Sequence, residues 1–170
     1  MQTYSIADQI KIEKAIIFAS AKFALCNNLA KPTLLHAVRV GSWLYFHRYD
    51  PNIVIAGFLH DIIEDTNTTE QEIGEVFGKK VSTLVTANTK NANITEKKLR
   101  NDELIKRCLA KSEKAAIVKA ADILDNYMYY INLNDKNGID YCKNNAASFK
   151  RYFNNSYKDK IFSKFFEEVK

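Results

Sequence analysis

The chain is poor in residues that interrupt helices, with 5 glycines and 2 prolines among 170 residues. This scarcity favours long helices with short connections over a strand-and-turn architecture. The 3 cysteines are scattered and form no CxxC pair, so they are read as reduced thiols of a cytoplasmic protein. No apolar run reaches the roughly 18 residues of a membrane span. The polar first eight residues also lack the basic-then-apolar pattern of a secretory signal.

What the chain does contain is a hydrophobic fraction of 46%, with 9 Tyr and 10 Phe, which is enough for a substantial core. We expect one domain, residues 1–170, and an all-α bundle, because no segment shows a convincing strand pattern. A turn-rich loop is expected over residues 132–138. The predicted helices cover about 8–26, 33–48, a segment starting at Pro51, a short helix from Thr69 to Gly78, 81–87, 96–111, 115–130, 140–153 and 156–168.

Residues 53–63 form an apolar run that is interrupted only by His60 and Asp61. Such a run should be buried on nearly every side, and an unpartnered carboxylate there would cost several kcal/mol. A divalent metal ion would accept both an imidazole and a carboxylate. The run therefore indicates a metal site, with Glu64 and Asp65 one helical turn further on.

A second carboxylate, Asp122, lies inside the apolar run 115–124, with Lys119 and Asn126 on the same helical face. His36, on a third apolar helix, completes a donor set of two nitrogens and two oxygens. This set can hold Mn²⁺, Fe²⁺ or Zn²⁺, and octahedral geometry with retained waters would favour Mn²⁺.

Each of these residues also has an interpretation without a metal. A lone His on an apolar face is usually a core histidine, and Lys119 could neutralise Asp122 with no ion at all. The combination of all four favours the metal site. Gly57 lies one turn before Asp61, and Gly in a helix costs about 1 kcal/mol relative to Ala. It therefore predicts the close approach of another helix.

The order His36, His60-Asp61, Asp122 resembles the HD superfamily of metal-dependent phosphohydrolases. The stretch GFLHDIIEDT at 57–66 is more specific, because it is similar to a block of the RelA/SpoT-type alarmone hydrolases. The resemblance continues through Thr68-Thr69, Phe77-Gly78, Thr89-Lys90 and KAADILDN at 119–126, and it covers about residues 8 to 165.

This resemblance implies a role for each matching residue. The implied metal ligands are His36, His60, Asp61 and Asp122. Glu64 and Asp65 would orient and activate water, although a solvated helix end is the alternative for this pair. The candidate substrate contacts are Asn126, Lys90, Lys97, Arg100 and Tyr152, and for the lysines a solvated face, or for Tyr152 core packing, is the alternative.

The chain departs from the family pattern where the guanine is expected to bind. Asn27 and Asn28 stand where the family usually carries Arg-Lys, and Ala37 replaces the usual proline. The ligands and the water-activating pair are intact, so hydrolysis is better supported than the identity of the base. We expect one ion, because His47, the remaining histidine, lies at the end of its helix next to Arg48.

These observations predict a stand-alone hydrolase that removes pyrophosphate from guanosine 3′,5′-bis(diphosphate) with one Mn²⁺-like ion. An HD phosphohydrolase of another nucleotide, such as a nucleoside monophosphate, is the alternative. A non-catalytic module that uses the net charge of +5 on nucleic acid is a further one. The expected partner is a small anionic nucleotide, not a membrane, and self-association is left open.

Overall fold

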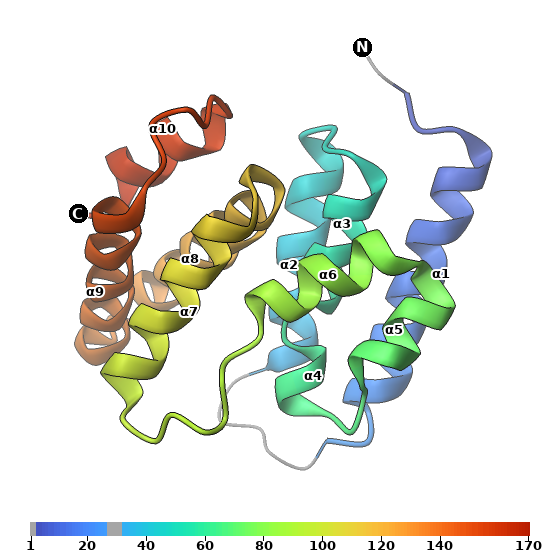
Figure 1. Ribbon diagram of the computed structural model, residues 1–170, viewed down its shortest axis with the longest axis horizontal. Coiled ribbons are helices and arrows are strands. Elements are labelled where there is room, and N and C mark those ends of the chain that lie inside the picture. Colours follow the sequence, from blue (N-terminus) through green and yellow to red (C-terminus); the bar gives the residue numbers. More distant parts are fainter. Residues whose placement is uncertain (1–2, 27–31) are drawn as a thin grey trace. The chain divides into compact units, whose positions relative to one another are not determined.

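The computed structural model describes residues 3–26 and 32–170, and every regular element in these ranges is a helix (Figure 1). The all-α prediction is therefore confirmed. The helices are α1 (Ile6–Phe23), α2 (Thr33–Phe46), α3 (Pro51–Leu59), α4 (Ile62–Asp65), α5 (Glu70–Phe77), α6 (Lys79–Asn88), α7 (Lys97–Lys111), α8 (Glu113–Asn132), α9 (Lys136–Tyr152) and α10 (Lys160–Glu168).

These helices form two compact units, Met1–Thr89 and Lys90–Lys170. The expectation of one domain over 1–170 stays a prediction. None of the helices in the described part of the chain is long and apolar enough to cross a bilayer. The three cysteines are free thiols.

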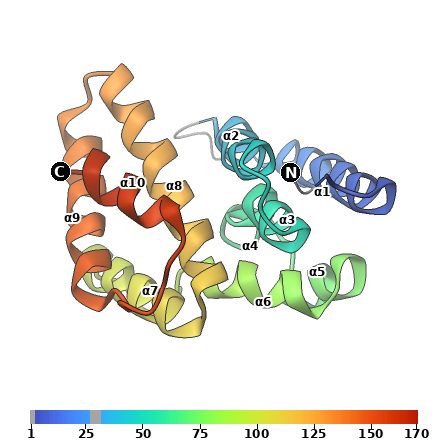
Figure 2. The ribbon, with the colours of Figure 1, turned by 90° about the horizontal axis from the view of Figure 1, so that it is seen from above.

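The first unit is built around α3, which packs against α1, α2 and α6, while α5 lies against α6. The three helices α1, α2 and α3 lie side by side in both views (Figures 1 and 2). The start of α3 follows from its sequence: Asp50 accepts a hydrogen bond from the Asn52 N–H at 2.8 Å, and Pro51 occupies the first turn. Every residue from Ile53 to Leu59 is buried, so this helix is the core of the unit.

The second unit is built around α8, which packs against α7, α9 and α10. The Ser112 hydroxyl caps its first turn by accepting from the Ala115 N–H at 3.2 Å. The apolar run 115–124 is buried throughout. Phenylalanine rings join α9 to α10: those of Phe149 and Phe165, for example, are tilted at 48° with their centroids 4.7 Å apart.

The helix predicted to start at Pro51 does so, but it ends at Leu59, because His60 and Asp61 form a turn between α3 and α4. One local prediction is wrong. The loop expected over 132–138 ends early, because Asp135 caps α9 by accepting from the Gly138 N–H at 3.2 Å. The chain reverses at Asn134, whose φ of 52° is left-handed. Asp135 and Gly138 therefore belong to the start of a helix and not to the predicted loop.

Candidate metal centre

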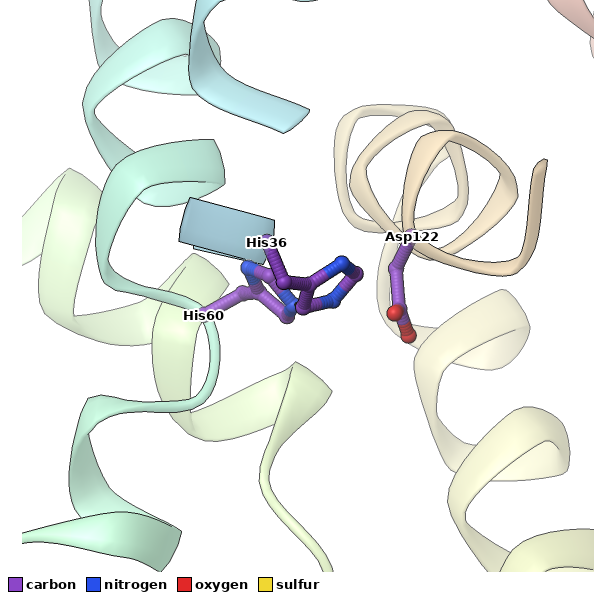
Figure 3. Close-up of side chains that lie close together, drawn as sticks. All are labelled: His36, His60 and Asp122. Atoms are coloured by element: carbon purple, nitrogen blue, oxygen red, sulfur yellow. The ribbon is translucent and has the colours of Figure 1, made fainter. Parts of the chain in front are cut away.

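The centre of the first unit holds two buried imidazoles. His36 lies on α2 and His60 directly follows α3, and their Nε2 atoms are 3.1 Å apart. The planes of the two rings, which are drawn in Figure 3, are inclined to each other by 77°. The His60 Nδ1–H donates to the Gly57 carbonyl at 2.8 Å, so the lone pair of His60 resides on Nε2, on the side of His36.

The Asp61 carboxylate lies close to both rings. Its Oδ2 lies 3.3 Å from His60 Nε2 and 3.7 Å from His36 Nε2. Adjacent residues of a regular helix do not face the same way. The turn at His60 and Asp61 removes this obstacle, so that both side chains reach His36. The break between α3 and α4, which sequence analysis missed, is therefore what assembles this part of the site.

Two glycines bring α2 and α3 close together behind the histidines. A Cβ on Gly57 would lie 2.5 Å from Leu44 Cδ1 and 3.2 Å from the Gly41 Cα. A Cβ on Gly41 would collide with the Phe58 ring. The predicted role of Gly57 is thus confirmed: its missing side chain allows α2, with His36, to approach α3.

Replacing Gly57 with alanine should lower the free energy of unfolding by about 1–3 kcal/mol, the usual cost of overpacking a core. Leu44 can move, but the backbone of Gly41 cannot move without shifting α2 and His36. Urea unfolding measures the change. The matched control is Gly74→Ala on α5, whose Cβ would meet only Ser82 at 3.5 Å, and which should be neutral or stabilising. Equal effects of both substitutions would contradict this packing argument.

In the second unit, α8 carries Asp122 with both carboxylate oxygens hydrogen-bonded. The Lys119 ammonium donates to Oδ2 at 2.9 Å, and the Asn126 amide donates to Oδ1 at 2.6 Å. All three residues are buried, and the face they were expected to share is confirmed. The alternative of a Lys119–Asp122 ion pair is therefore real. His36, His60 and Asp122 (Figure 3) are buried side chains of the types that hold a divalent ion.

Glu64 and Asp65 lie on the short helix α4, the first half-buried and the second exposed. The end of α4 is fixed by Thr66, whose hydroxyl lies 2.6 Å from the Ile62 carbonyl and accepts from the Thr68 N–H at 3.0 Å. The Cys26 thiol, just beyond α1, donates to the Asp65 carbonyl. Sequence analysis did not assign these holding roles, although Thr-x-Thr after a helix is a pattern of such turns.

The basic candidates lie at separate places. Lys90 follows α6, Lys97 begins α7 with its Nζ 5.0 Å from the centroid of the Tyr141 ring, and Arg100 donates to the Ile94 carbonyl at 3.5 Å. Their contact with substrate stays a prediction. Asn27 and Asn28 lie outside the described residues.

His47, the remaining histidine, ends up on the surface. Its ring is exposed and stacks on the ring of Trp43 with centroids 3.8 Å apart, and its Nδ1 lies 2.8 Å from the Trp43 carbonyl. That the chain binds one ion and no second stays a prediction.

The Tyr152 hydroxyl is part of the packing between α7 and α9. It donates to Asp102 Oδ2 at 2.7 Å, while Ser148 and Arg151 donate to Oδ1 at 2.6 and 3.2 Å. This favours the packing interpretation of Tyr152 over substrate contact. The hydrogen bonds from Ser148 and then Tyr152 lower the pKa of the Asp102 carboxyl below its usual value.

Replacing Asp102 with asparagine should lower the free energy of unfolding by about 1–2 kcal/mol at neutral pH, because charge-assisted hydrogen bonds are lost. Since the folded pKa is lowered, the stabilisation is present above the unfolded pKa of about 3.9 and is lost as pH falls through the folded pKa. Urea unfolding of both proteins at a series of pH values tests this. A difference that persists unchanged well below pH 4 would contradict it.

The chain is similar to several known proteins. A model of the HD domain family matches residues 15–140. The guanosine-3′,5′-bis(diphosphate) 3′-pyrophosphohydrolase of Aquifex aeolicus is 34% identical over 119 residues, and that of Spiroplasma citri is 33% identical over 122. Each match covers 68% of this chain but only 17% and 16% of those relatives, so the chain spans about a sixth of their length.

A solved structure, described as a metazoan ortholog of SpoT that hydrolyzes ppGpp and plays a role in starvation responses, matches with a TM-score of 0.76. The match covers 99% of this chain and 100% of that one, and at 21% identity it shows a shared fold. The family match spans His36 on α2, the turn with His60 and Asp61 after α3, and Asp122 on α8. The chain belongs to the HD domain family.

Proposed function

We propose that this chain is a metal-dependent phosphohydrolase that removes the 3′-pyrophosphate from guanosine 3′,5′-bis(diphosphate), leaving GDP and releasing pyrophosphate. Membership of the HD family and the names of the two bacterial relatives support the activity and the substrate class. Within the chain, the support comes from a constellation of ligand-type side chains that is followed, on the next short helix, by two carboxylates.

The observation that carries the proposal is the convergence of three donor atoms in the first unit. The Nε2 atoms of His36 and His60 and the Asp61 Oδ2 are separated by 3.1, 3.3 and 3.7 Å. Donors that share one ion, each about 2 Å from it, lie on the order of 3 Å from one another. The three atoms therefore fit an ion, and we propose Asp122 as the fourth ligand.

The proposed ion is Mn²⁺. A set of two imidazoles and two carboxylates suits a first-row divalent ion, and an octahedral ion would keep positions for water and substrate. The Gly57 carbonyl accepts the Nδ1 proton of His60, which fixes the tautomer whose Nε2 lone pair can bind the ion. When bound, the ion would polarise a phosphoryl oxygen and lower the pKa of water.

The remaining chemistry belongs to the chain's own side chains. Glu64 would take a proton from the attacking water while the oxygen of that water forms a bond to the phosphorus attached to the 3′ oxygen. Asp65 would orient the water. The bond between the phosphorus and the 3′ oxygen breaks, and the 3′ oxygen gains a proton. Thr66 and Cys26 hold the short helix that carries the two carboxylates. Lys90, Lys97, Arg100 and Asn126 are proposed to contact the phosphates and the nucleoside.

The substrate is tested by incubating the protein with Mn²⁺ and a panel of nucleotides, and by separating the products chromatographically. We expect guanosine 3′,5′-bis(diphosphate) to yield GDP and pyrophosphate in equal amounts. Orthophosphate from a nucleoside monophosphate, with the bis(diphosphate) left intact, would favour the alternative substrate that Asn27 and Asn28 suggest. No hydrolysis, combined with nucleic-acid binding that weakens steeply with salt, would favour the non-catalytic module.

A further inference from the structure

Lys119 forms a buried ion pair with Asp122, the carboxylate proposed as the fourth metal ligand. The ammonium and the carboxylate are 2.9 Å apart, and their side chains are only 6% and 12% exposed. Lysine is rarely buried unless it is paired, because removing its charge from water is costly. Both residues lie on α8, one turn apart, so the pair is part of the helix itself.

An ammonium and a divalent cation are both attracted to the same carboxylate, and they repel each other. Lys⁺ offers three donors and no acceptor, so it cannot join the ion's ligands. An ion bound to Asp122 would lie close to the Lys119 charge in a buried environment, where like charges repel strongly. The Asn126 amide on Oδ1 makes no such conflict, because it is neutral and only orients the carboxylate.

We propose that Lys119 is a built-in counter-ion of Asp122 that competes with the metal ion. It balances and orients the carboxylate before the ion binds, and it weakens the ion's affinity by repulsion. This inference rests on the proposed function, because it takes Asp122 as a ligand. Lys119 is thus a positioning residue that limits how tightly the site holds its metal.

The test is to measure Mn²⁺ affinity by calorimetry, together with the thermal unfolding midpoint in EDTA, for the wild type and for Lys119→Met. We expect Lys119→Met to bind Mn²⁺ at least about ten-fold more tightly, because a nearby positive charge is removed. In EDTA its midpoint should fall below that of the wild type, because the buried carboxylate has lost the ammonium that balances its charge. Excess Mn²⁺ should narrow that gap.

Two further variants serve as a replacement and as a control. Lys119→Gln keeps a hydrogen-bond donor without the charge, so it serves if Lys119→Met does not fold, and it should also bind Mn²⁺ more tightly. Lys143→Met removes an exposed charge on α9 and should change neither quantity. Unchanged or weaker Mn²⁺ binding by the Lys119 variants would overturn this inference alone. A wild type that binds no Mn²⁺ would instead overturn the proposed function, and the inference with it.

Discussion

Replacing Glu64 with alanine should reduce the rate of pyrophosphate release by a factor of at least about 100 while leaving Mn²⁺ binding intact. A positioned general base contributes on the order of 10² to 10⁴ in rate. Glu64 lies on α4, after the turn that carries His60 and Asp61, so it is placed next to the proposed ligands without being one of them. The measurement pairs a hydrolysis assay with a calorimetric Mn²⁺ titration on the same preparation.

Measuring the hydrolysis rate and Mn²⁺ binding separately distinguishes a general base from a metal ligand and from a structural residue. A structural role for Glu64 at a solvated helix end would leave the rate nearly unchanged. The control Glu13→Ala removes an exposed carboxylate on α1, in the same unit, and should behave as the wild type. Full activity of Glu64→Ala would refute the proposed mechanism, and loss of Mn²⁺ binding would make Glu64 a ligand instead.

Replacing Asp61 with alanine should abolish both Mn²⁺ binding and hydrolysis. The Asp61 carboxylate is the negatively charged donor beside the two imidazoles, within 3.7 Å of each Nε2. Without it, the ion would keep two neutral nitrogens in the first unit, a set that no longer balances its charge. His60→Ala should have the same double effect, since it removes one of those nitrogens.

The folded state must be verified for this prediction, because a loss of structure would also remove metal and activity. Asp61 lies in the turn between α3 and α4 and belongs to neither helix, so circular dichroism should show the helices intact. Asp140→Ala, an exposed carboxylate on α9, is the matched control and should retain both properties. Tight Mn²⁺ binding by folded Asp61→Ala would remove Asp61 from the ligand set.

The buried polar residues were easier to recognise in the sequence than the backbone break that lies between two of them. A His-Asp pair in an apolar run, and an Asp with Lys and Asn at helical spacing, are visible because buried charge is costly and demands partners. Gly57 was informative for a similar reason, since glycine in a helix needs a compensating contact. These inferences rest on local energetics, which a sequence displays directly.

The turn at His60 and Asp61 could not be predicted in this way. The residues around it are apolar and compatible with a continuous helix, and no glycine or proline marks the break. The break is accounted for by tertiary geometry, since it allows both side chains to face His36 on another helix. For Tyr152, likewise, the decisive partner is Asp102, fifty residues away, and a resemblance to a family position carries no such information.

The most direct test of this account is to titrate the metal-free protein with Mn²⁺ and record pyrophosphate release from guanosine 3′,5′-bis(diphosphate). The account predicts no turnover before the ion is added, and a rate that rises to a plateau at one ion per chain, with GDP and pyrophosphate formed in equal amounts. Full turnover by the metal-free protein, or a protein that binds the ion and leaves this nucleotide intact, would contradict it.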